Sequence, residues 1–343
     1  MSNVYSIGFG VGTHNSKGDW LEVFYPQPLL NPTAEIANAV TGTLNIDSGN
    51  VAVALEEAQL QPLADQLEAA GAPEQAGILR QFAGSQRPLV AVVLHSDEAP
   101  QSVPEAYLKL HLLSHRLVKP HGTKLDGVFG QLVNVAWTNQ GAIDLAELPQ
   151  RQLEARLKGE LLEVSCVDKF PKMTNYVVPT GVRIAHTARV RLGAYLGEGT
   201  TIMHEGFVNF NAGTEGPGMI EGRISAGVFV GAGSDLGGGS STMGTLSGGG
   251  NIVISLGEGC LLGANAGTGI PLGDRCTVES GLYITSGTKV AVLDEKGEVA
   301  ETAKARDLAG KSDLLFRRNS ATGAVECLTN KSAVELNAEL HSN

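Results

Sequence analysis

Aliphatic residues recur at intervals of six in the second half of this chain, and this repeat constrains the fold more than any other feature. One run extends over residues 178–208, a second over 224–236 and a third over 254–290. Its members are Val178, Ile184, Val190, Leu196, Ile202, Val208, Ile224, Val230, Leu236, Ile254, Cys260, Ala266, Leu272, Val278, Ile284 and Val290. A hexapeptide repeat is typical of a β-solenoid, in which each unit supplies one short strand and one corner.

Glycine marks the same part of the chain. Of the 44 glycines, 27 lie between Tyr176 and Val290. Glycine-rich segments also occur as flexible linkers, but a linker would not carry regularly spaced aliphatic residues. At solenoid corners, glycine allows positive φ angles and the close approach of neighbouring coils. Three hexads make one triangular coil, so the sequence predicts a left-handed parallel β-helix over residues 174–292.

The first 173 residues have the mixed pattern of an α/β domain. An apolar run over residues 88–95 predicts a buried strand. Helical spacing of apolar residues is found in three segments, at residues 51–70, 104–118 and 145–158. We therefore expect an α/β N-terminal domain over residues 1–173.

After Val290 the hexads stop and charged residues become frequent. Residues 314–318 and 324–328 predict a short closing hairpin, and residues 333–340 predict an amphipathic tail. Because the open end of a solenoid exposes its core, such ends need a cap. We expect residues 293–343 to form a small C-terminal cap.

The charge balance restricts the possible partners. The formal net charge is −11, whereas nucleic-acid binding relies on positive charge that neutralises phosphates. The N-terminus lacks a signal-peptide pattern, and no apolar stretch approaches the roughly 18–20 residues of a membrane span. Four scattered cysteines without a C-x-x-C pair favour neither a disulfide framework nor a zinc site. We expect a cytoplasmic protein that binds small molecules, and neither nucleic acid nor a membrane.

Glu221 and Arg223 lie in the first break of the repeat, in GTEGPGMIEGRIS, which we interpret as an insertion. A carboxylate beside apolar Met219 and Ile220 is a candidate functional group, and an arginine binds carboxylate or phosphate with two parallel hydrogen bonds. A surface ion pair between the two is the alternative. The second break, GGGSSTMGTLSGGG at residues 237–250, lacks the Lys-Ser/Thr end of a phosphate loop, so we expect an extruded loop.

His204 and Glu205 lie at the end of a predicted coil, in MHEGFVNFNAG. A histidine at a corner can act as a general base, as in many acyltransferases of this fold, or have a structural role. Glu205 can bind a cation or cap the corner. A metal site of the carbonic-anhydrase kind needs several histidines on the coils, and the predicted coils contain His186 and His204 alone.

Basic residues cluster late in this acidic chain and are candidates for binding the phosphates of a large anionic cofactor. A solvated cap surface is the alternative for each of them. They are Lys289, Lys304, Arg306, Lys311, Arg317 and Arg318.

Several segments together resemble the tetrahydrodipicolinate N-succinyltransferase family. They are MHEGFVNFNAGTEG, MIEGRISAGVFVGAGSDLGGGSS, GTLSGGGN, CLLGANAGTGIPLGD, ESGLYITSGTKV and LLFRRNS. The resemblance is dense from about Asp168 to the C-terminus, and the N-terminal third is similar in type to the long form of the family. It implies transfer of the succinyl group of succinyl-CoA to ring-opened tetrahydrodipicolinate, in diaminopimelate and lysine synthesis.

The resemblance also implies site residues. The catalytic carboxylate would be Glu221 in MIEGR, as an acyl-anhydride former or as a base. The implied cofactor contacts are Arg223, Gly238, Ser241, Ala264, Glu279, Ser280, Gly287, Lys304, Phe316, Arg317, Arg318 and Asn319.

Two further properties follow from the resemblance. The family forms homotrimers with each active site between neighbouring prisms. Some members carry Mg²⁺ on the trimer axis, held by the glutamate of MHEG, here Glu205, and by an upstream aspartate. Ala188 occupies that aspartate's position in this sequence.

Two alternatives of different kinds stay open at this point. A hexapeptide acetyltransferase would use acetyl-CoA, with His204 as its base. A purely structural solenoid would bind no CoA.

Overall fold

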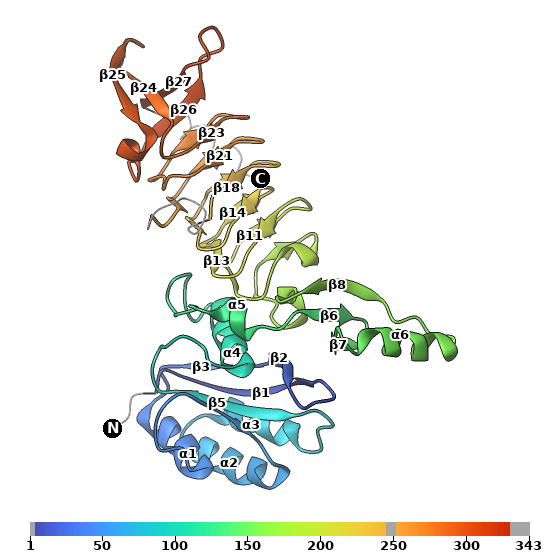
Figure 1. Cartoon of the computed structure of the whole chain (residues 1–343). Coiled ribbons are helices and arrows are strands. Elements are labelled where there is room, and N and C mark those ends of the chain that lie inside the picture. Colours follow the sequence, from blue (N-terminus) through green and yellow to red (C-terminus); the bar gives the residue numbers. More distant parts are fainter. Residues whose placement is uncertain (1–3, 245–251, 330–343) are drawn as a thin grey trace. The chain divides into compact units, whose positions relative to one another are not determined.

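The computed structural model describes residues 4–244 and 252–329, and many of its elements are labelled in Figure 1. The chain divides into two compact units, which are described separately. The first comprises Met1–Leu112 and Gly122–Pro171, and the second Leu113–His121 and Lys172–Asn343. The three-domain division expected from the sequence stays a prediction, and the expected tail at residues 333–340 lies outside the described residues.

An antiparallel sheet with strand order β2-β1-β5-β4 forms the centre of the first unit, with β3 paired to β1. The predicted strand at residues 88–95 is confirmed, since β5 is buried along its whole length. The strands are β1 (Ser6–His14), β2 (Trp20–Phe24), β3 (Leu29–Leu30), β4 (Val51–Ala54) and β5 (Leu89–Leu94).

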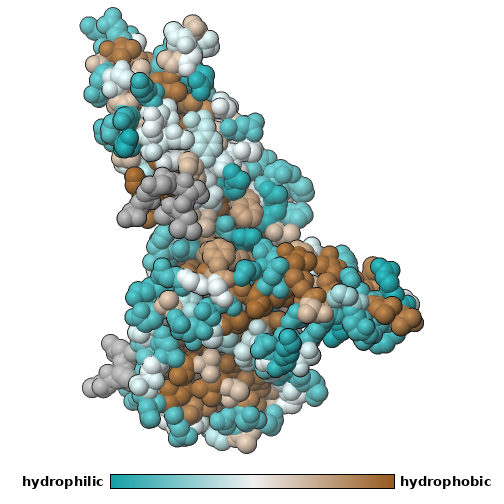
Figure 2. Space-filling model, in the orientation of Figure 1, coloured by the Kyte–Doolittle hydropathy of each residue, from teal (hydrophilic) through white to brown (hydrophobic). Residues whose placement is uncertain are grey.

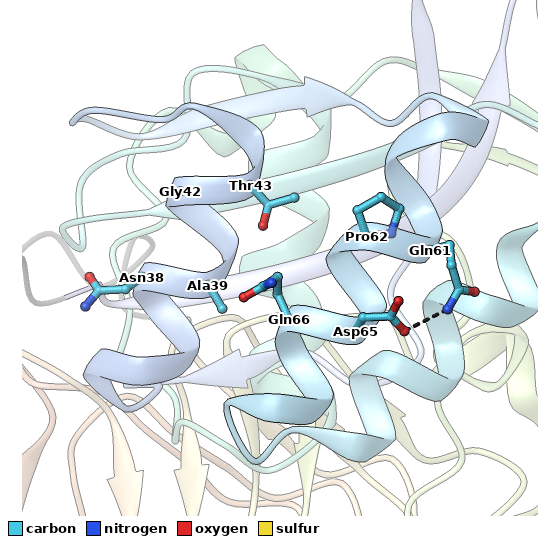
Figure 3. Close-up of a pocket in the computed structure, with 8 residues that line it drawn as sticks. All are labelled: Asn38, Ala39, Gly42, Thr43, Gln61, Pro62, Asp65 and Gln66. Atoms are coloured by element: carbon cyan, nitrogen blue, oxygen red, sulfur yellow. Dashed lines mark hydrogen bonds between the residues drawn. The ribbon is translucent and has the colours of Figure 1, made fainter.

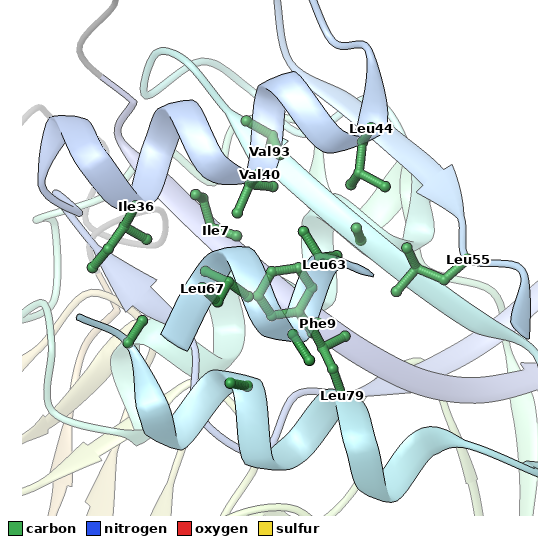
Figure 4. Close-up of a cluster of buried hydrophobic side chains, with 14 of the residues drawn as sticks. Ile7, Phe9, Ile36, Val40, Leu44, Leu55, Leu63, Leu67, Leu79 and Val93 are labelled. Atoms are coloured by element: carbon green, nitrogen blue, oxygen red, sulfur yellow. The ribbon is translucent and has the colours of Figure 1, made fainter. Parts of the chain in front are cut away.

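Three helices pack against this sheet and bury the core drawn in Figure 4. Ile7, Phe9 and Val93 from the strands meet Val40 and Leu63 from the helices. The helices are α1 (Ala34–Leu44), α2 (Glu57–Ala69) and α3 (Pro73–Phe82).

The helix predicted over residues 51–70 is wrong at its beginning. Val51–Ala54 is strand β4, with Val51 opposite Val93 in the register. β-Branched valines at alternate positions suit a sheet edge. The helix begins at Glu57, where Glu56 and Gln59 form a capping box.

A smaller sheet, β7-β6-β8, completes the first unit. The helix predicted over residues 145–158 is confirmed as α6. Apolar side chains are exposed on this part, visible as brown residues at the right of Figure 2; they are Leu153, Leu157, Leu161 and Val167. The elements are α4 (Val103–Ser114), α5 (Val128–Gln131), β6 (Val135–Thr138), β7 (Gly141–Asp144), α6 (Leu148–Leu157) and β8 (Val164–Asp168).

The helix predicted over residues 104–118 ends at Ser114, because the chain beyond it bonds to the second unit's coils. The Ser114 hydroxyl donates to Ala194 O, and the Arg116 guanidinium donates to the carbonyls of Leu196 and Thr180. Arg116 itself has a φ of 62°, which helical backbone excludes. Across residues 4–244 and 252–329, no helix is long and apolar enough to cross a membrane.

The second unit is a left-handed parallel β-helix, as predicted, with three sheets that form the faces of a prism (Figure 1). Short helices η1 (Met173–Asn175) and η2 (Thr187–Arg189) lie at its beginning. Face 1 consists of β9 (Arg183–Ile184), β11 (Thr200–Ile202), β14 (Gly218–Ile220), β17 (Asp235–Leu236), β20 (Leu261–Leu262) and β22 (Thr277–Val278). Face 2 consists of β12 (Phe207–Val208), β15 (Arg223–Ile224), β18 (Ser241–Thr242), β21 (Gly267–Thr268) and β23 (Tyr283–Ile284). Face 3 consists of β10 (Ala194–Leu196), β13 (Ala212–Thr214), β16 (Phe229–Val230) and β19 (Ser255–Leu256).

The repeat residues from Val190 onward are buried in the prism, as the periodicity predicts. Earlier in the first run, Ile184 is half-buried and Val178 is 68% exposed. It precedes β9, the first strand of face 1, so no coil covers it. Stacked aliphatic residues require a neighbouring coil on both sides to be fully removed from water.

The first break in the repeat is not an insertion, which corrects our interpretation. Thr214 and Ile220 continue the six-residue phase and are buried, opposite Leu196 and Ile202 in the register. The phase then changes through a single step of four residues, from Ile220 to Ile224. Glu221 therefore lies on a shortened coil corner rather than in an extruded loop.

The first half of the third run also needs a correction in phase, whereas Leu272, Val278 and Ile284 stack as predicted, opposite Leu256, Leu262 and Thr268. The residues that stack on the inner face are Leu256, Leu262 and Thr268, opposite Val230, Leu236 and Thr242. The predicted residues lie two positions earlier, at Ile254, Cys260 and Ala266. They are buried as well, because residues two apart on a strand share a face.

The second break contains less loop than expected. Gly237–Ser240 form an ordinary corner and Ser241–Thr242 form β18. The extra residues therefore begin only at Met243, and residues 245–251 of this stretch lie outside the described part. The longer extrusion predicted over 237–250 is wrong at its start.

The C-terminal cap closes face 1. Strand β26 adds in parallel to β22, with Val278 opposite Phe316, and its antiparallel partner β27 confirms the predicted hairpin. The Phe316 side chain is fully buried over the last coil. The cap elements are β24 (Lys289–Leu293), β25 (Val299–Lys304), η3 (Ala305–Leu308), β26 (Leu314–Arg318) and β27 (Val325–Thr329).

Candidate active site

The corner that carries Glu221 is the tightest link between faces 1 and 2. Only Glu221 and Gly222 separate β14 from β15. Four backbone hydrogen bonds hold it to the adjacent coils, one of them from the Gly239 N–H to Glu221 O (3.4 Å). The Glu221 N–H donates to Leu236 O (2.8 Å), Gly222 O accepts from Phe207 N–H (3.0 Å), and the Arg223 N–H donates to Ser240 O (2.8 Å).

Glycines make this close stacking possible. A Cβ atom on Gly206, in the coil before, would lie 2.3 Å from Ile220 O. A Cβ on Gly222 would lie 2.1 Å from the Ser240 hydroxyl oxygen. Neither distance is compatible with a side chain, so these positions require glycine for the close approach.

The Glu221 side chain is exposed in the single chain. Its Oε2 atom lies against Gly238, where an added Cβ would be 3.5 Å away. Gly237 and Gly239 flank Gly238, so no side chain crowds the carboxylate from the next coil. A bulky acyl group can therefore reach this carboxylate from solvent.

The predicted cofactor residues of face 1 line up with Glu221 along one edge of the prism. The pairing of Leu236 with Leu262, of Leu262 with Val278 and of Val278 with Phe316 aligns the residues two positions further on. These residues are Gly238, Ala264, Ser280 and Arg318. Glu221 is only one position after Ile220, which pairs with Leu236, and it joins the line because its carboxylate lies against Gly238. We call the line of Glu221, Gly238, Ala264, Ser280 and Arg318 the edge column.

Main-chain hydrogen bonds connect successive members of the edge column. The Asn265 N–H donates to Gly238 O (2.9 Å), and the Gly281 N–H donates to Ala264 O (2.8 Å). The Glu279 carboxylate accepts from the backbone N–H of Arg318 (2.7 Å). The fold thus brings together residues that are almost a hundred positions apart in sequence.

Arg223 and Ser241 meet on face 2, beside the edge column. They are opposite each other in the register, and the Arg223 guanidinium donates to the Ser241 hydroxyl from Nε (3.2 Å) and Nη2 (2.8 Å). Further along the same row, Tyr283 covers Gly267, where an added Cβ would be 2.2 Å from the ring. This face is therefore open, polar near Arg223 and aromatic near its end.

Gly287 and Lys304 belong to a second group, away from the edge column. Gly287 lies in the turn after β23 of face 2, and Lys304 is opposite Lys289 in the β24–β25 hairpin. An open hollow of about 590 Å³ lies there. Its lining residues are Lys289, Thr302, Ala303, Lys304, Arg306 and Asp307.

The remaining predicted contacts lie in the cap hairpin. Phe316 is buried, so its side chain does not face solvent. Asn319 and Arg317 donate to the Glu326 carboxylate at 2.7 Å and 2.9 Å, and these hydrogen bonds lower the pKa of Glu326. Arg318 Nη1 donates to Gly323 O (2.9 Å).

His204 and Glu205 occupy the corner of the coil before Glu221. His204 Nδ1 and Glu205 Oε1 are 2.8 Å apart, and this hydrogen bond lowers the pKa of the Glu205 carboxyl. The ring of His186, from the preceding coil, packs edge-on against His204 with 5.4 Å between centroids. Within the described ranges, no group of three or more His, Cys, Asp or Glu side chains is arranged to hold a metal ion.

The sequence does not single out Arg189 and Ser240, which also lie at this site. The Ser240 hydroxyl is buried beside Gly222 without a hydrogen-bond partner in the described structure. Arg189 precedes the inward residue Val190, just as Arg223 precedes Ile224. The six-residue repeat is therefore the sequence signal that could have identified Arg189, because it predicts that both arginines point outward from the same face.

Another hollow of about 600 Å³ lies on the first unit, between α1 and α2 (Figure 3). None of the predicted site residues lines it. Its lining residues are Asn38, Ala39, Gly42, Thr43, Gln61, Pro62, Asp65 and Gln66. The predicted site residues all lie in the second unit.

Three family models match parts of this chain. The model described as "Tetrahydrodipicolinate N-succinyltransferase N-terminal" matches residues 70–130, and that described as "Tetrahydrodipicolinate N-succinyltransferase middle" matches residues 132–172. The model "Hexapeptide repeat of succinyl-transferase" matches residues 253–286.

The chain is also similar over its whole length to named proteins of other bacteria. It is 70% identical to the 2,3,4,5-tetrahydropyridine-2,6-dicarboxylate N-succinyltransferase of Pseudomonas putida, with 100% of both chains covered. It is 61% identical to the protein of the same name from Vibrio cholerae, with 99% of both chains covered. A crystal structure from Campylobacter jejuni, described as a 2,3,4,5-tetrahydropyridine-2-carboxylate N-succinyltransferase, superposes with a TM-score of 0.89 at 32% identity. That match covers 97% of this chain and 94% of the other.

Proposed function

Because this chain belongs to the tetrahydrodipicolinate N-succinyltransferase family, we propose that Glu221 is its catalytic carboxylate and that the edge column holds succinyl-CoA. The enzyme transfers the succinyl group of succinyl-CoA to ring-opened tetrahydrodipicolinate, in the succinylase route to diaminopimelate and lysine. The observation that carries the proposal is the exposed Glu221 carboxylate on a glycine-lined corner, in line with the predicted cofactor residues. We place the reaction in the cytoplasm.

The proposed chemistry follows from what acyl transfer requires. The acceptor ammonium must lose a proton before its nitrogen attacks the thioester, and Glu221 can accept that proton or receive the acyl group first. Negative charge then develops on the thioester oxygen, and the backbone N–H of Gly238 is the candidate donor to it, since those of Gly237 and Gly239 already donate to Leu262 O and Glu221 O. Ordered binding of both substrates beside Glu221 supplies much of the remaining rate increase.

The division of the cofactor residues into two groups supports a site shared between copies. The edge column lies between faces 1 and 2, whereas Gly287 follows face 2 and Lys304 lies in the cap. Two copies packed side by side could place both groups on one cofactor. We therefore propose a homotrimer with active sites between neighbouring prisms, since closed rings are formed by interfaces of this head-to-tail kind.

The trimer proposal predicts a single sedimenting species of three chains at micromolar concentration. Sedimentation velocity and equilibrium measurements check it directly. A stable monomer that is fully active would contradict both the trimer and the shared site.

A Mg²⁺ ion held by Glu205, as the resemblance implies, does not fit the residues of this chain. The Glu205 carboxylate already pairs with His204, and Ala188, at the position of the second ligand, has no oxygen in its side chain. We route no step of the reaction through a metal ion.

Thiol release tests the proposed function. With succinyl-CoA and the pimelate acceptor together, free CoA should form much faster than with succinyl-CoA alone, because the acceptor amine takes the acyl group. Acetyl-CoA is the matched control for the acetyltransferase alternative. Equal or faster release from acetyl-CoA, or release that does not depend on the acceptor, would contradict the proposal.

A further inference from the structure

The other residues of the edge column, proposed to hold the cofactor, all lie on one side of Glu221. Gly238, Ala264, Ser280 and Arg318 follow it in successive coils towards the C-terminal cap. Acyl transfer needs the acceptor nitrogen and the thioester carbon to meet in a defined orientation. With the cofactor on the C-terminal side, the coils on the N-terminal side of Glu221 are left for the acceptor.

Among the arginines and lysines of those coils, Arg189 has a guanidinium that reaches this edge, where it bonds to the carbonyls of Glu205 and Gly206. Val190 bridges to Val208, and Phe207 is opposite Arg223, so Arg189 lies in the outward row of face 2 with Phe207 and Arg223. Neighbouring strands are about 4.8 Å apart, which places the backbones of the two arginines roughly 10 Å from each other. Glu221 is two residues before Arg223, at the corner that begins this row.

The Arg189 side chain is held in place by the next coil. Its Nε donates to Gly206 O (3.0 Å) and its Nη2 to Glu205 O (2.8 Å). Nη1 makes no hydrogen bond to any of the described residues. The side chain is only partly buried. A guanidinium fixed on one edge and open on the other is organised to bind a carboxylate.

We propose that Arg189 binds one carboxylate of the acceptor, an amino acid with a second carboxylate at the far end of a seven-carbon chain. This inference rests on the proposed function, since it needs Glu221 and the edge column in their assigned roles. A positive charge is needed here because Glu221 and Glu205 lie close by, in a chain of net charge −11. Without it, these carboxylates would repel the two carboxylates of the acceptor.

Direct binding of 2-aminopimelate, which has the amine and both carboxylates of the acceptor, tests this proposal without turnover. We expect Arg189→Gln to weaken its binding about tenfold in calorimetry with CoA present, and Arg189→Lys to weaken it less. Arg183→Gln is the matched control, because Arg183 is exposed in the outward row of face 1; its binding should equal that of the wild type. Circular dichroism and sedimentation establish that each variant is folded.

Two analogues that each lack one carboxylate of 2-aminopimelate identify the contact. For the analogue that lacks the carboxylate bound by Arg189, the Arg189→Gln substitution should not weaken binding further, because the partner of the arginine is already absent. In steady state the same variant should raise the acceptor KM about tenfold and leave the KM for succinyl-CoA within twofold. Unchanged binding of 2-aminopimelate, or a selective rise in the KM for succinyl-CoA, would overturn the proposal. If binding of 2-aminopimelate depended on Arg189 but the wild-type protein transferred no succinyl group, the proposed function would be contradicted instead.

Discussion

Replacing Glu221 by glutamine should lower kcat by about 10²–10⁴-fold, the usual contribution of a positioned acid or base. Glutamine keeps the shape of the side chain but cannot accept a proton or an acyl group. The corner itself is held by backbone hydrogen bonds of Glu221, Gly222 and Arg223, so folding should be unaffected. CoA binding by calorimetry should stay near the wild-type value, and thiol release measures the loss.

His204→Ala is the matched control for this prediction. His204 lies one coil away and bonds to Glu205, so its loss should reduce kcat much less than the loss of the Glu221 carboxylate. The opposite pattern, with an inactive His204→Ala and a nearly normal Glu221→Gln, would favour the acetyltransferase type of mechanism in which a histidine is the base.

Removing the charges of Arg317 and Arg318 together should raise the KM for succinyl-CoA tenfold or more. Charge-assisted hydrogen bonds to phosphate contribute roughly 1.5–3 kcal/mol each, and 1.4 kcal/mol corresponds to one decade. Arg318 ends the edge column, whereas Arg317 pairs with Glu326, so we expect Arg318→Ala alone to account for most of the change. Steady-state kinetics at increasing salt should show a smaller difference, because salt screens exposed charges.

Arg275→Ala provides the comparison for the double variant. Arg275 is also exposed near the cap, but its guanidinium is paired with Asp313 at 2.6 Å and lies outside the edge column. Its KM for succinyl-CoA should equal that of the wild type. If the double variant raised the KM of the acceptor and left that of succinyl-CoA unchanged, the two arginines would belong to the acceptor site or the cap.

The sequence by itself determined the solenoid. Inward aliphatic residues at every sixth position have no other regular structure in which all of them are buried, and the structure buries those from Val190 onward. The glycine content marked the same region, because the corners at Gly206 and Gly222 have no room for a Cβ atom. The family followed from motifs along this part of the chain.

The exact phase of the coils was decided by tertiary packing. Residues two apart on a strand face the same way, so Cys260 and Leu262 are both buried and the sequence alone did not show which of them stacks. Only the strand register distinguishes the two. The same holds for the strand at Val51–Ala54, which pairs with β5 in spite of the helical pattern around it.

The arrangement of the site was likewise visible only in the folded chain. Motif resemblance named Glu221, Ala264 and Arg318 one by one, but their common edge depends on the pairing of β17, β20, β22 and β26. Arg189 carries no motif, and it becomes a candidate because its coil places it in the row of Arg223. In a solenoid, the number of residues per coil decides which residues lie above one another. The short step from Ile220 to Ile224 changes that number, and only the packing of the coils shows where such a step occurs.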